Sequence, residues 1–387
     1  MISWKLKTRS VRPIGLDIGH NSIKMIQLGI NGGRISVLAA DKVRLDANIN
    51  SDGEERKSFI VSKIKQMLSE GNFRGRNVIS CLPNGQLKIT SLRLPDGETG
   101  EIEQALRKEA AQRFGLDAER DAINYLVAGN VQEGEAIKHE LILFATDNET
   151  IKKHIEMLEA TQLRPLAIDN VPCALFRSFE RSLRRQEDRE RTVVFVDVGS
   201  RFTTVVFGCG GENGGDISFI KQIPVGGEKF NRETAARLGI SIGEAEILRD
   251  TLRKEKSGTG GHLSNDTNGC SLDASTRQVI TDSVSVVAEE LAREISLCFR
   301  YYTVTFRGKR VERAVFAGGE AYESILLNVL KRQLPVEIEM SQPLRGFDMM
   351  NVNFESDRRG LLCEWAVAVG LSLKGWNGTE MQKKGPE

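Results

Sequence analysis

Two segments, about half a chain apart, place an aspartate two residues before a glycine, between two apolar runs. The first is Asp17-Ile18-Gly19 within residues 14–26, and the second is Asp197-Val198-Gly199 within residues 193–207. Glycine adopts positive φ and lets backbone N–H groups come close to an anion. The aspartate offers a hard oxygen ligand for a hydrated Mg²⁺ that accompanies phosphates. Two such turns predict a clamp that holds the phosphates of a nucleotide from two sides.

A third glycine turn strengthens this interpretation. Residues 314–317 form an apolar run, Gly318-Gly319 follow, and residues 322–334 have the pattern of a helix. Bare backbone at a Gly-Gly turn lets a flat, uncharged group such as an adenine ring lie against it. Either Asp-x-Gly segment alone also fits a type I′ hairpin turn between two ordinary strands. The three turns in this order favour a nucleotide site.

Length and composition bound the class of protein. The chain has 387 residues, 40% hydrophobic and 28% charged, which fits a globular protein with two lobes. A net charge of +1 gives no electrostatic case for binding nucleic acid. The six cysteines show no C-x-x-C pair, so neither a zinc site nor a disulfide framework is predicted. We find no run of about 18 to 20 apolar residues and no signal peptide, and therefore expect a cytoplasmic protein.

The order of predicted elements divides the first half of the chain. Residues 1–85 form the first part of a first lobe, with strands at 13–16, 23–29, 35–45 and 77–82 and a helix around 59–68. Residues 86–163 form an inserted α+β module, with strands at 87–94, 122–128 and 140–145, a helix from 102 to 114 and a closing helix at 149–160. Residues 164–190 return to the first lobe through a strand at 165–169 and a helix at 173–185.

Residues 191–375 form the second lobe. Strands are expected at 193–198, 203–207, 216–224 and 314–317, and helices at 228–238, 242–252, 284–302, 322–334 and 360–373. Residues 254–275 are rich in Gly, Ser, Asn and Asp and are expected to form a disordered surface loop, and residues 376–387 a loose tail. The basic start from Trp4 to Arg12 fits either contact with anionic lipid or a solvated terminus.

The ordered set of motifs resembles the actin, Hsp70 and sugar-kinase superfamily, and within it the PilM branch, close to FtsA. The resemblance covers nearly the whole chain and is carried by segments 16–24, 94–95, 108–110, 168–172, 196–199, 225–227, 239–241, 244–246 and 317–319. It implies an α/β fold with two actin-like lobes built on RNase H-like repeats. The inserted module then corresponds to the small α+β subdomain that these proteins carry, called 1C, which is SHS2-like.

The resemblance also implies roles for individual residues. Backbone amides would hold phosphates at Gly19, His20, Asn21 and Ser22 of the first turn, with Lys24 as a phosphate partner, and at Gly199, Ser200 and Arg201 of the second. Asp17 and Asp197 would hold Mg²⁺, mostly through water, and position the attacking water. The nucleoside would lie against Glu246, Arg249, Gly318, Gly319 and Glu320.

Two positions depart from the family pattern. Arg249 stands where the pattern has lysine; it keeps the charge but is not an equivalent donor. His20-Asn21 stands where PilM proteins usually have Ser-Ser. His20 fits either a solvated loop residue or a ring beside the phosphates that makes nucleotide affinity depend on pH. Arg201 likewise fits either an exposed turn residue or a cation for the phosphates.

The resemblance predicts an ATP-binding, actin-like cytoplasmic adaptor of type IV pilus assembly, or of a related secretion machine. Its partner would be the cytoplasmic tail of a PilN-like membrane protein, held in a groove beside the inserted module, together with other pilus assembly proteins. Membrane contact would be indirect, at the inner membrane and through that partner. No general base is identifiable, so we expect a conformational switch that is at most a slow ATPase. Self-association stays open.

Three alternatives remain at this point. The start of the chain resembles exopolyphosphatases, which are phosphotransfer enzymes like the sugar kinases, but residues 200–204 and the inserted module do not fit that group. FtsA-like division proteins form filaments and end in an amphipathic membrane helix, whereas residues 374–380 are short and rich in glycine. A nucleotide-free scaffold like the cytoplasmic domain of GspL would not need Asp17, Asp197 and Gly318-Gly319.

Overall fold

The structure is a computed structural model. It describes residues 10–31, 34–45, 53–95, 97, 99–133, 135–183, 191–211, 215–256, 272–306, 311–352, 354 and 361–374. The start of the chain up to residue 9, residues 257–271 of the predicted loop, residue 375 and the predicted tail at 376–387 lie outside the described residues. No helix in the described ranges is long and apolar enough to cross a membrane.

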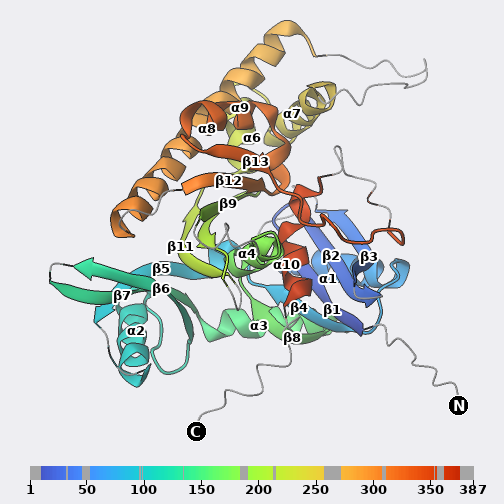
Figure 1. The fold of residues 1–387 in the computed structure, drawn as a ribbon. Helices are drawn as coiled ribbons and strands as arrows, with labels where there is room; N and C mark the ends of the chain where they lie inside the picture. Colours follow the sequence, from blue (N-terminus) through green and yellow to red (C-terminus); the bar gives the residue numbers. More distant parts are fainter. Residues whose placement is uncertain are drawn as a thin grey trace, which may run out of the picture.

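Two five-stranded sheets of the same topology form the two lobes (Figure 1). The first sheet has the order β3-β2-β1-β4-β8, with bounds Arg34–Arg44, Ser22–Asn31, Ser10–Ile18, Asn77–Cys81 and Arg164–Asp169. The second has the order β11-β10-β9-β12-β13, with bounds Asp216–Ile223, Thr203–Cys209, Thr192–Val198, Val311–Ala317 and Glu337–Met340. In both, the first three strands of the lobe are antiparallel and the last two add in parallel. The predicted duplication of the lobe is confirmed.

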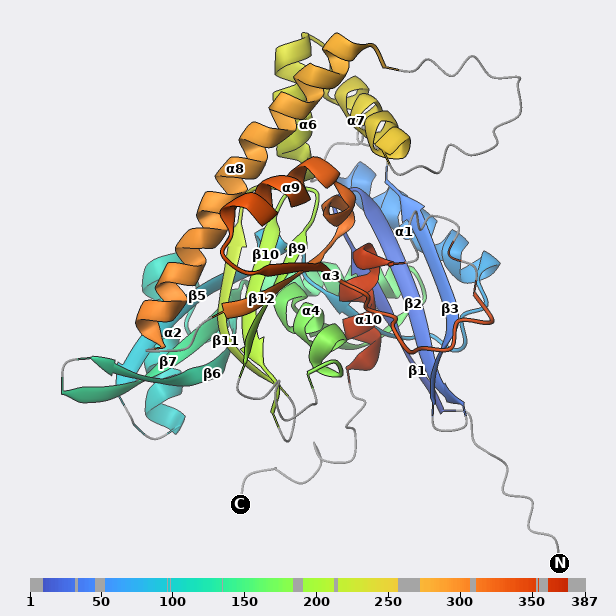
Figure 2. The same cartoon turned by 45° about the horizontal axis from the view of Figure 1, so that its top comes forward.

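Helices cover both faces of each sheet (Figure 2). The outer face of the first sheet packs on α1 (Glu54–Glu70) and α3 (Asn148–Ala160). The outer face of the second packs on a larger group: α6 (Gly227–Leu238), α7 (Ile242–Lys256), α8 (Ala274–Thr305) and α9 (Ser324–Gln333). Between the two sheets lie α4 (Val171–Glu180) and α10 (Ala366–Leu373). Short 3-10 helices occur at η1 (Asn84–Gln86), η2 (Gly319–Tyr322) and η3 (Cys363–Trp365).

Local sequence signals explain where several helices begin and end. Asp147 caps α3 by accepting a hydrogen bond from the Thr150 amide, and Asn170 caps α4 by accepting one from the Cys173 amide. Gly239 ends α6 in the left-handed conformation that glycine adopts without strain. These are helix caps that sequence patterns recognise, and the corresponding predicted boundaries agree with the structure to within about two residues.

The two central helices approach each other and the first sheet backbone to backbone. A Cβ atom built on Gly370 of α10 would lie 1.7 Å from the carbonyl oxygen of Ala174 in α4. One built on Gly15 of β1 would lie 2.1 Å from the carbonyl oxygen of Ala368 in α10. Ser372 extends this contact, because its hydroxyl donates to the Pro13 carbonyl at 2.8 Å. Small residues therefore fix the separation of the two sheets.

The inserted module is a three-stranded sheet with one helix. Its order is β5-β7-β6, with bounds Lys88–Pro95, Ala136–Thr146 and Ala122–Glu133, and α2 (Thr99–Phe114) packs on one face. The opposite face packs Ile142 and Phe144 against Phe176, Phe195 and Ile220, so it lies on α4 and on the second lobe's sheet. The module thus belongs to the first lobe in sequence and packs on the second lobe in space.

A buried glutamate reinforces this contact between the module and the second lobe. Glu140 on β7 is 1% exposed, and its carboxylate accepts hydrogen bonds from Arg93 Nε at 2.8 Å and from the Tyr301 hydroxyl of α8 at 2.9 Å. Arg93 also donates to the Thr305 hydroxyl at 3.3 Å. A buried charge that is this fully paired holds the module in one orientation.

Several predicted boundaries need correction. The helix at 149–160 was expected to close the inserted module, but Met157 and Leu158 of α3 pack in the core of the first sheet. The helix at 360–373 was assigned to the second lobe, but α10 begins at Ala366 and packs on β1, β2 and α4 of the first lobe. The helix at 173–185 ends at Glu180. Helices α7 and α8 occupy residues 254–256 and 274–275, which were assigned to the loop.

The contact at Gly370 generates a stability prediction. Gly370→Ala places a methyl group on the Ala174 carbonyl, and separating the two helices is expected to destabilise the protein by about 2 to 4 kcal/mol. Gly243→Ala in α7 is the matched control, because a Cβ there meets nothing within 4 Å; it should be neutral or stabilise by up to about 1 kcal/mol. Urea unfolding of both variants measures the difference. Equal stabilities would contradict the close packing.

Candidate functional site

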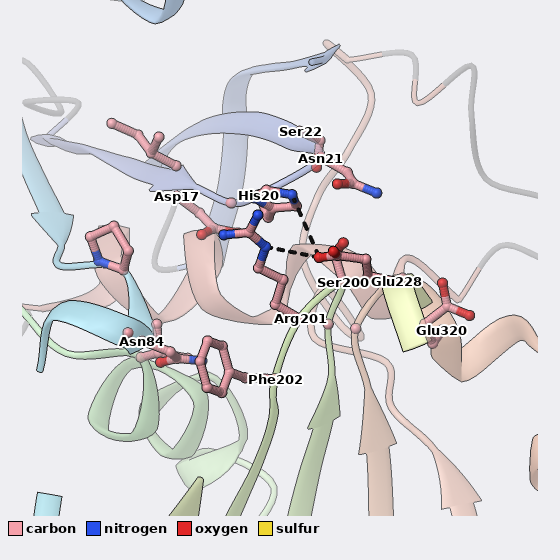
Figure 3. A pocket seen from close by; sticks show the side chains of 18 of the residues that line it. Asp17, His20, Asn21, Ser22, Asn84, Ser200, Arg201, Phe202, Glu228 and Glu320 are labelled. Atoms are coloured by element: carbon pink, nitrogen blue, oxygen red, sulfur yellow. Dashed lines mark hydrogen bonds and ion pairs between the residues drawn. The ribbon is translucent and has the colours of Figure 1, made fainter. Parts of the chain in front are cut away.

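A single cleft of about 1590 Å³ lies between the two lobes and gathers every residue that the sequence nominated. Its walls include Asp17, Gly19, His20, Asn21, Ser22 and Lys24 of the first lobe, and Asp197, Gly199, Ser200, Arg201, Glu246, Arg249, Gly318, Gly319 and Glu320 of the second. Figure 3 shows several of these side chains converging from β-hairpins of the two lobes. The cleft is the candidate site.

The two Asp-x-Gly turns have the same backbone geometry. The Gly19 amide donates to the Ser22 carbonyl at 2.9 Å, and the Gly199 amide donates to the Phe202 carbonyl at 3.0 Å. Both are turns of antiparallel hairpins, β1–β2 and β9–β10, so each segment is a hairpin turn, as the alternative interpretation expected. The turns nevertheless lie on one cleft. We name them the first turn (Gly19–Ser22) and the second turn (Gly199–Phe202).

Neighbouring elements hold each turn in place. Arg56 of α1 donates to the His20 carbonyl at 2.6 Å in the first turn. At the second turn, the first amides of α6 do the same work: Gly227 N–H donates to the Gly199 carbonyl at 3.0 Å and Glu228 N–H to the Ser200 carbonyl at 2.8 Å. The carbonyl groups of His20, Gly199 and Ser200 are therefore hydrogen-bonded within their own lobes.

Two carboxylates, one from each lobe, lie on the floor of the cleft. Asp17 forms an ion pair with Lys24, its partner across the hairpin ladder, at 3.1 Å. Burial would lower the pKa of Lys24, but the attraction and hydrogen bond of Asp17, together with the charges of Asp197 and Glu364, outweigh it and raise the pKa. Burial and the charge of Asp17 raise the pKa of Asp197 to about 6. The negative charge of Asp197 is therefore only partly compensated by its surroundings.

These two carboxylates fit a partly hydrated Mg²⁺ better than a metal ion whose ligands all come from the protein. Mg²⁺ is bound in proteins by one or two carboxylates and keeps several waters and phosphate oxygens. In the part of the chain that the structure describes, no group of three or more His, Cys, Asp or Glu side chains is placed to hold a metal ion. Asp17 and Asp197 would hold such an ion only together with a ligand that supplies further oxygens.

Arg201 and His20 meet at one carboxylate that the sequence did not nominate. Arg201 Nε donates to Glu228 Oε2 at 2.9 Å, and His20 Nε2 lies 3.9 Å from the same oxygen (Figure 3). Burial would raise the pKa of Glu228, but the hydrogen bond and charge of Arg201 outweigh it and lower the pKa. Glu228 follows Gly226-Gly227 at the start of α6, where an acidic residue is ordinary, so its position gave no signal in the sequence.

The Gly-Gly turn requires glycine at its first position. Gly318 has φ of +92°, and a Cβ atom there would lie 2.4 Å from the Val198 carbonyl oxygen and 2.8 Å from Asp197 Oδ1. Its amide donates to the Cys363 carbonyl at 3.1 Å. A Cβ on Gly319 would meet nothing within 4 Å, so that residue exposes bare backbone toward open space.

Arg249 and Glu320 line the cleft but direct their charges into the second lobe. Arg249 is 2% exposed; it donates to the Gly227 carbonyl at 3.2 Å, to Glu320 at 2.8 Å and to Asn231. Arg253 completes the network with Glu320 and with Glu323, the latter at 2.7 Å. Burial would raise the pKa of Glu320, but the two arginines lower it. Within the described residues, only Arg249 Nε of this buried guanidinium has no hydrogen-bond partner.

Contacts across the cleft join the two lobes at three places that the sequence did not reveal. At the mouth, Arg44 of β3 pairs with Glu246 of α7 and, at 3.3 Å, with Asp250. Beside the Gly-Gly turn, Lys42 of β3 pairs with Glu364 of η3 at 3.1 Å, and Glu364 also accepts a hydrogen bond from the Tyr322 hydroxyl of η2.

At the base of the cleft, Asn84 of η1 forms the third contact. Its amide nitrogen donates to the Thr204 hydroxyl at 3.1 Å, and its oxygen accepts from Gln222 at 3.0 Å. Asn84 precedes the inserted module and touches the strand that leaves the second turn. It therefore connects three parts of the molecule.

Comparison with solved structures defines the fold. A structure described as "PilM-PilN type IV pilus biogenesis complex" is similar with a TM-score of 0.74 and 22% identity, over 94% of this chain and 98% of that one. The ethanolamine utilization protein EutJ from Carboxydothermus hydrogenoformans is similar with a TM-score of 0.53 and 12% identity, over 94% of this chain and 89% of that one. The protein has the two-lobed actin-like fold, as predicted.

The sequence itself assigns the family. The sequence profile described as "Type IV pilus assembly protein PilM" matches residues 15–256, which is more than half of the chain. The chain belongs to the PilM family of type IV pilus assembly proteins.

The raised pKa of Asp197 predicts a stability that depends on pH. The pKa is about 6 in the folded protein, above the ordinary 3.8, so the folded state binds this proton more tightly than the unfolded state. That contribution to stability is full below pH 3.8 and is lost as pH rises through 6. Without metal or nucleotide, Asp197→Asn should therefore stabilise the protein at pH 7.5 by on the order of 2 kcal/mol and change little near pH 4.

Thermal or urea unfolding at the two pH values measures this difference. Asp282→Asn, on the exposed face of α8, is the control for removal of a charge and should be neutral at both. A variant with asparagine at position 197 that is less stable than the wild type at pH 7.5 would show that the carboxylate is stabilised in the cleft, contrary to this account.

Proposed function

We propose that the protein is an ATP-binding adaptor of type IV pilus assembly, in which the nucleotide and Mg²⁺ act as a conformational ligand between the lobes. The observation that carries the proposal is the pair of matched Asp-x-Gly turns that face one cleft from opposite lobes. A ligand held by both turns links the lobes, and it shifts their arrangement by its difference in affinity for the two states.

The phosphates are assigned to the space between the turns. Backbone amides of Gly19, His20, Asn21 and Ser22 would hold them from one side, and those of Gly199, Ser200 and Arg201 from the other. The Ser200 hydroxyl supports this assignment, because it is buried and has no hydrogen-bond partner among the described residues. A buried donor without a partner is costly, and a phosphate oxygen would supply one. Lys24 lies beside Asp17 at the first turn and would share its charge with the phosphates.

Asp17 and Asp197 are assigned to Mg²⁺, with water and phosphate oxygens completing its coordination. The ion would neutralise phosphate charge, and it would offset the burial and the repulsion by Asp17 that raise the pKa of Asp197. The adenosine is assigned to the wall of Gly318 and Gly319, with Glu246, Arg249 and Glu320 along its edge. Arg249 Nε is buried and has no hydrogen-bond partner among the described residues. It is therefore the N–H of the Arg249 guanidinium that would be available to the nucleoside.

Turnover is proposed to be slow. In-line attack on the terminal phosphate needs a group that positions water and further positive charge at the transition state. The acidic side chain placed between the turns, Glu228, is engaged by Arg201, and Asp17 is engaged by Lys24. Neither is a free base in this arrangement. The nucleotide then acts by being bound, and an occasional hydrolysis would reset the switch.

The partner is proposed to be a short cytoplasmic peptide of a PilN-like inner-membrane protein, contacting the first lobe and the inserted module. Support comes from the family and from the similarity to the solved PilM-PilN complex. The protein would then act in the cytoplasm and reach the membrane through that partner. The lobe contacts at Asn84 and Glu140 supply a physical route by which the cleft and the module influence each other.

Nucleotide binding is tested by isothermal titration with ATP and Mg²⁺. We expect micromolar affinity for the wild type and at least about tenfold weaker binding for Asp17→Ala, because it removes one of the two carboxylates for the ion. Asp282→Asn is the matched control on α8 and should bind like the wild type. Titration with EDTA in place of Mg²⁺ should weaken the wild type to the level of the variant, and a phosphate-release assay measures turnover. Absence of binding by the wild type would overturn the nucleotide assignment.

The switch itself is tested with the partner peptide. A synthetic peptide of the PilN-like protein's cytoplasmic tail should bind with an affinity that changes by about three- to tenfold between the ATP-bound and nucleotide-free protein. Linkage then requires the peptide to change the ATP affinity by the same factor. Fluorescence anisotropy measures both. A peptide that binds equally well in both states would leave an adaptor without a nucleotide switch.

A further inference from the structure

Glu228 lies where the two turns approach each other. Its side chain reaches Arg201 of the second turn at 2.9 Å and comes within 3.9 Å of His20 of the first turn. Arg232, one helical turn further along α6, also pairs with it. In Figure 3, His20 and Arg201 approach the Glu228 carboxylate from one side, and Glu320 lies on the other side. Glu228 is thus an anion that pairs with two arginines and lies beside both turns of the proposed phosphate site.

The backbone and the side chain of Glu228 have separable roles. Its amide donates to the Ser200 carbonyl at 2.8 Å and so fixes the second turn. The side chain is 23% exposed and extends into the cleft on three rotatable bonds. A change of rotamer can therefore withdraw the carboxylate without disturbing the turn or the helix.

We propose that the Glu228 carboxylate is an internal substitute for the terminal phosphate of ATP, and that its displacement makes the cleft distinguish ATP from ADP. This inference rests on the proposed nucleotide site. A terminal phosphate that approaches the same side of Arg201 would repel the Glu228 carboxylate, because like charges in a partly buried site repel strongly. A planar guanidinium binds carboxylate and phosphate with the same geometry, so Arg201 exchanges one for the other.

The position of Arg201 selects the terminal phosphate. In Figure 3, Arg201 and Glu320 lie on opposite sides of Glu228, and Glu320 marks the adenosine wall. The phosphate farthest from the adenosine therefore reaches Arg201, and a diphosphate leaves Glu228 in its place. Arg232 pairs with the other carboxylate oxygen of Glu228 from an exposed position on α6, outside the second turn. Lys229 is paired with Glu290, and Arg56 is bound to the His20 carbonyl.

The test is isothermal titration of Glu228→Gln with Mg-ATP and with Mg-ADP. Glutamine keeps the size and a hydrogen-bonding oxygen but removes the competing charge. We expect the Kd for ATP to fall about three- to tenfold and the Kd for ADP to change less than about twofold. Glu289→Gln, which removes an exposed carboxylate of α8 away from the cleft, should change neither.

A double-mutant cycle separates this role from a merely structural one. Arg201→Gln should weaken ATP more than ADP, and in the Arg201→Gln background the gain from Glu228→Gln should disappear. A structural role of Glu228 would instead alter both nucleotides alike, with or without Arg201. Melting temperatures of all four proteins verify that each is folded. Should Glu228→Gln fail to fold, Glu228→Asp, whose shorter side chain draws the carboxylate back from Arg201, takes its place in the same cycle.

The outcomes distinguish this inference from the proposed function. If the wild type binds nucleotide and Glu228→Gln binds ATP no more tightly, the nucleotide site stands and the substitute role is wrong. If only Glu228→Gln binds ATP, the carboxylate occupies the phosphate position and this inference stands, but the wild type is not an ATP-binding adaptor and the proposed function is wrong. If neither protein binds any nucleotide, both are overturned.

Discussion

The separation of the two sheets is set by backbone contact. Helices α4 and α10 lie between the sheets, and at Gly370 and Gly15 there is no room for even a methyl group. Close packing of this kind is not continuously deformable. The turns at the ends of β1 and β9 consequently face each other at a fixed base, and motion between the lobes has to occur above it. The cleft and the placement of both aspartates depend on this one contact.

The charges that line the cleft are balanced largely by one another. Lys24 is paired with Asp17, Arg201 with Glu228, Arg44 with Glu246, and Arg249 with Glu320. Buried charges are tolerated in proteins when they are paired in this way. A polyanionic ligand that enters the cleft therefore has to break some of these ion pairs and replace the carboxylate in each. Its affinity is then a difference between two sets of ion pairs, which makes it sensitive to single substitutions.

The sequence predicted the elements of the fold and the cleft residues through local patterns. Apolar runs around Asp17 and Asp197 indicated strands that end in tight turns, and the repeated order of strands indicated two similar lobes; the structure confirms both. Asp147 and Asn170 are caps whose pattern is visible in the sequence. All of these signals act over a few residues.

What the sequence did not predict is determined by contacts between distant segments. Helix α3 follows the module in the chain, yet its Leu158 packs against the first sheet. The spacing of apolar residues shows that one face of this helix is buried, but it does not show which sheet covers that face. Glu228, Arg44 and Asn84 became visible as site residues only through partners 27, 202 and 120 residues away. Arg249 was expected at the nucleoside, and its guanidinium proves to be mostly occupied within the lobe. Its role at the nucleoside remains a proposal.

The packing of the inserted module limits how it can change over evolution. One face of its sheet rests on α2, and the other is completed by Phe176, Phe195 and Ile220, which belong to segments far along the chain. The inserted module therefore does not form a core that is independent of the rest of the protein. Excised, it would expose Ile142 and Phe144, and the remaining protein would expose an aromatic surface of its own. A module transplanted from a relative would have to arrive with a matching face of the second lobe, so the two are expected to diverge as a pair.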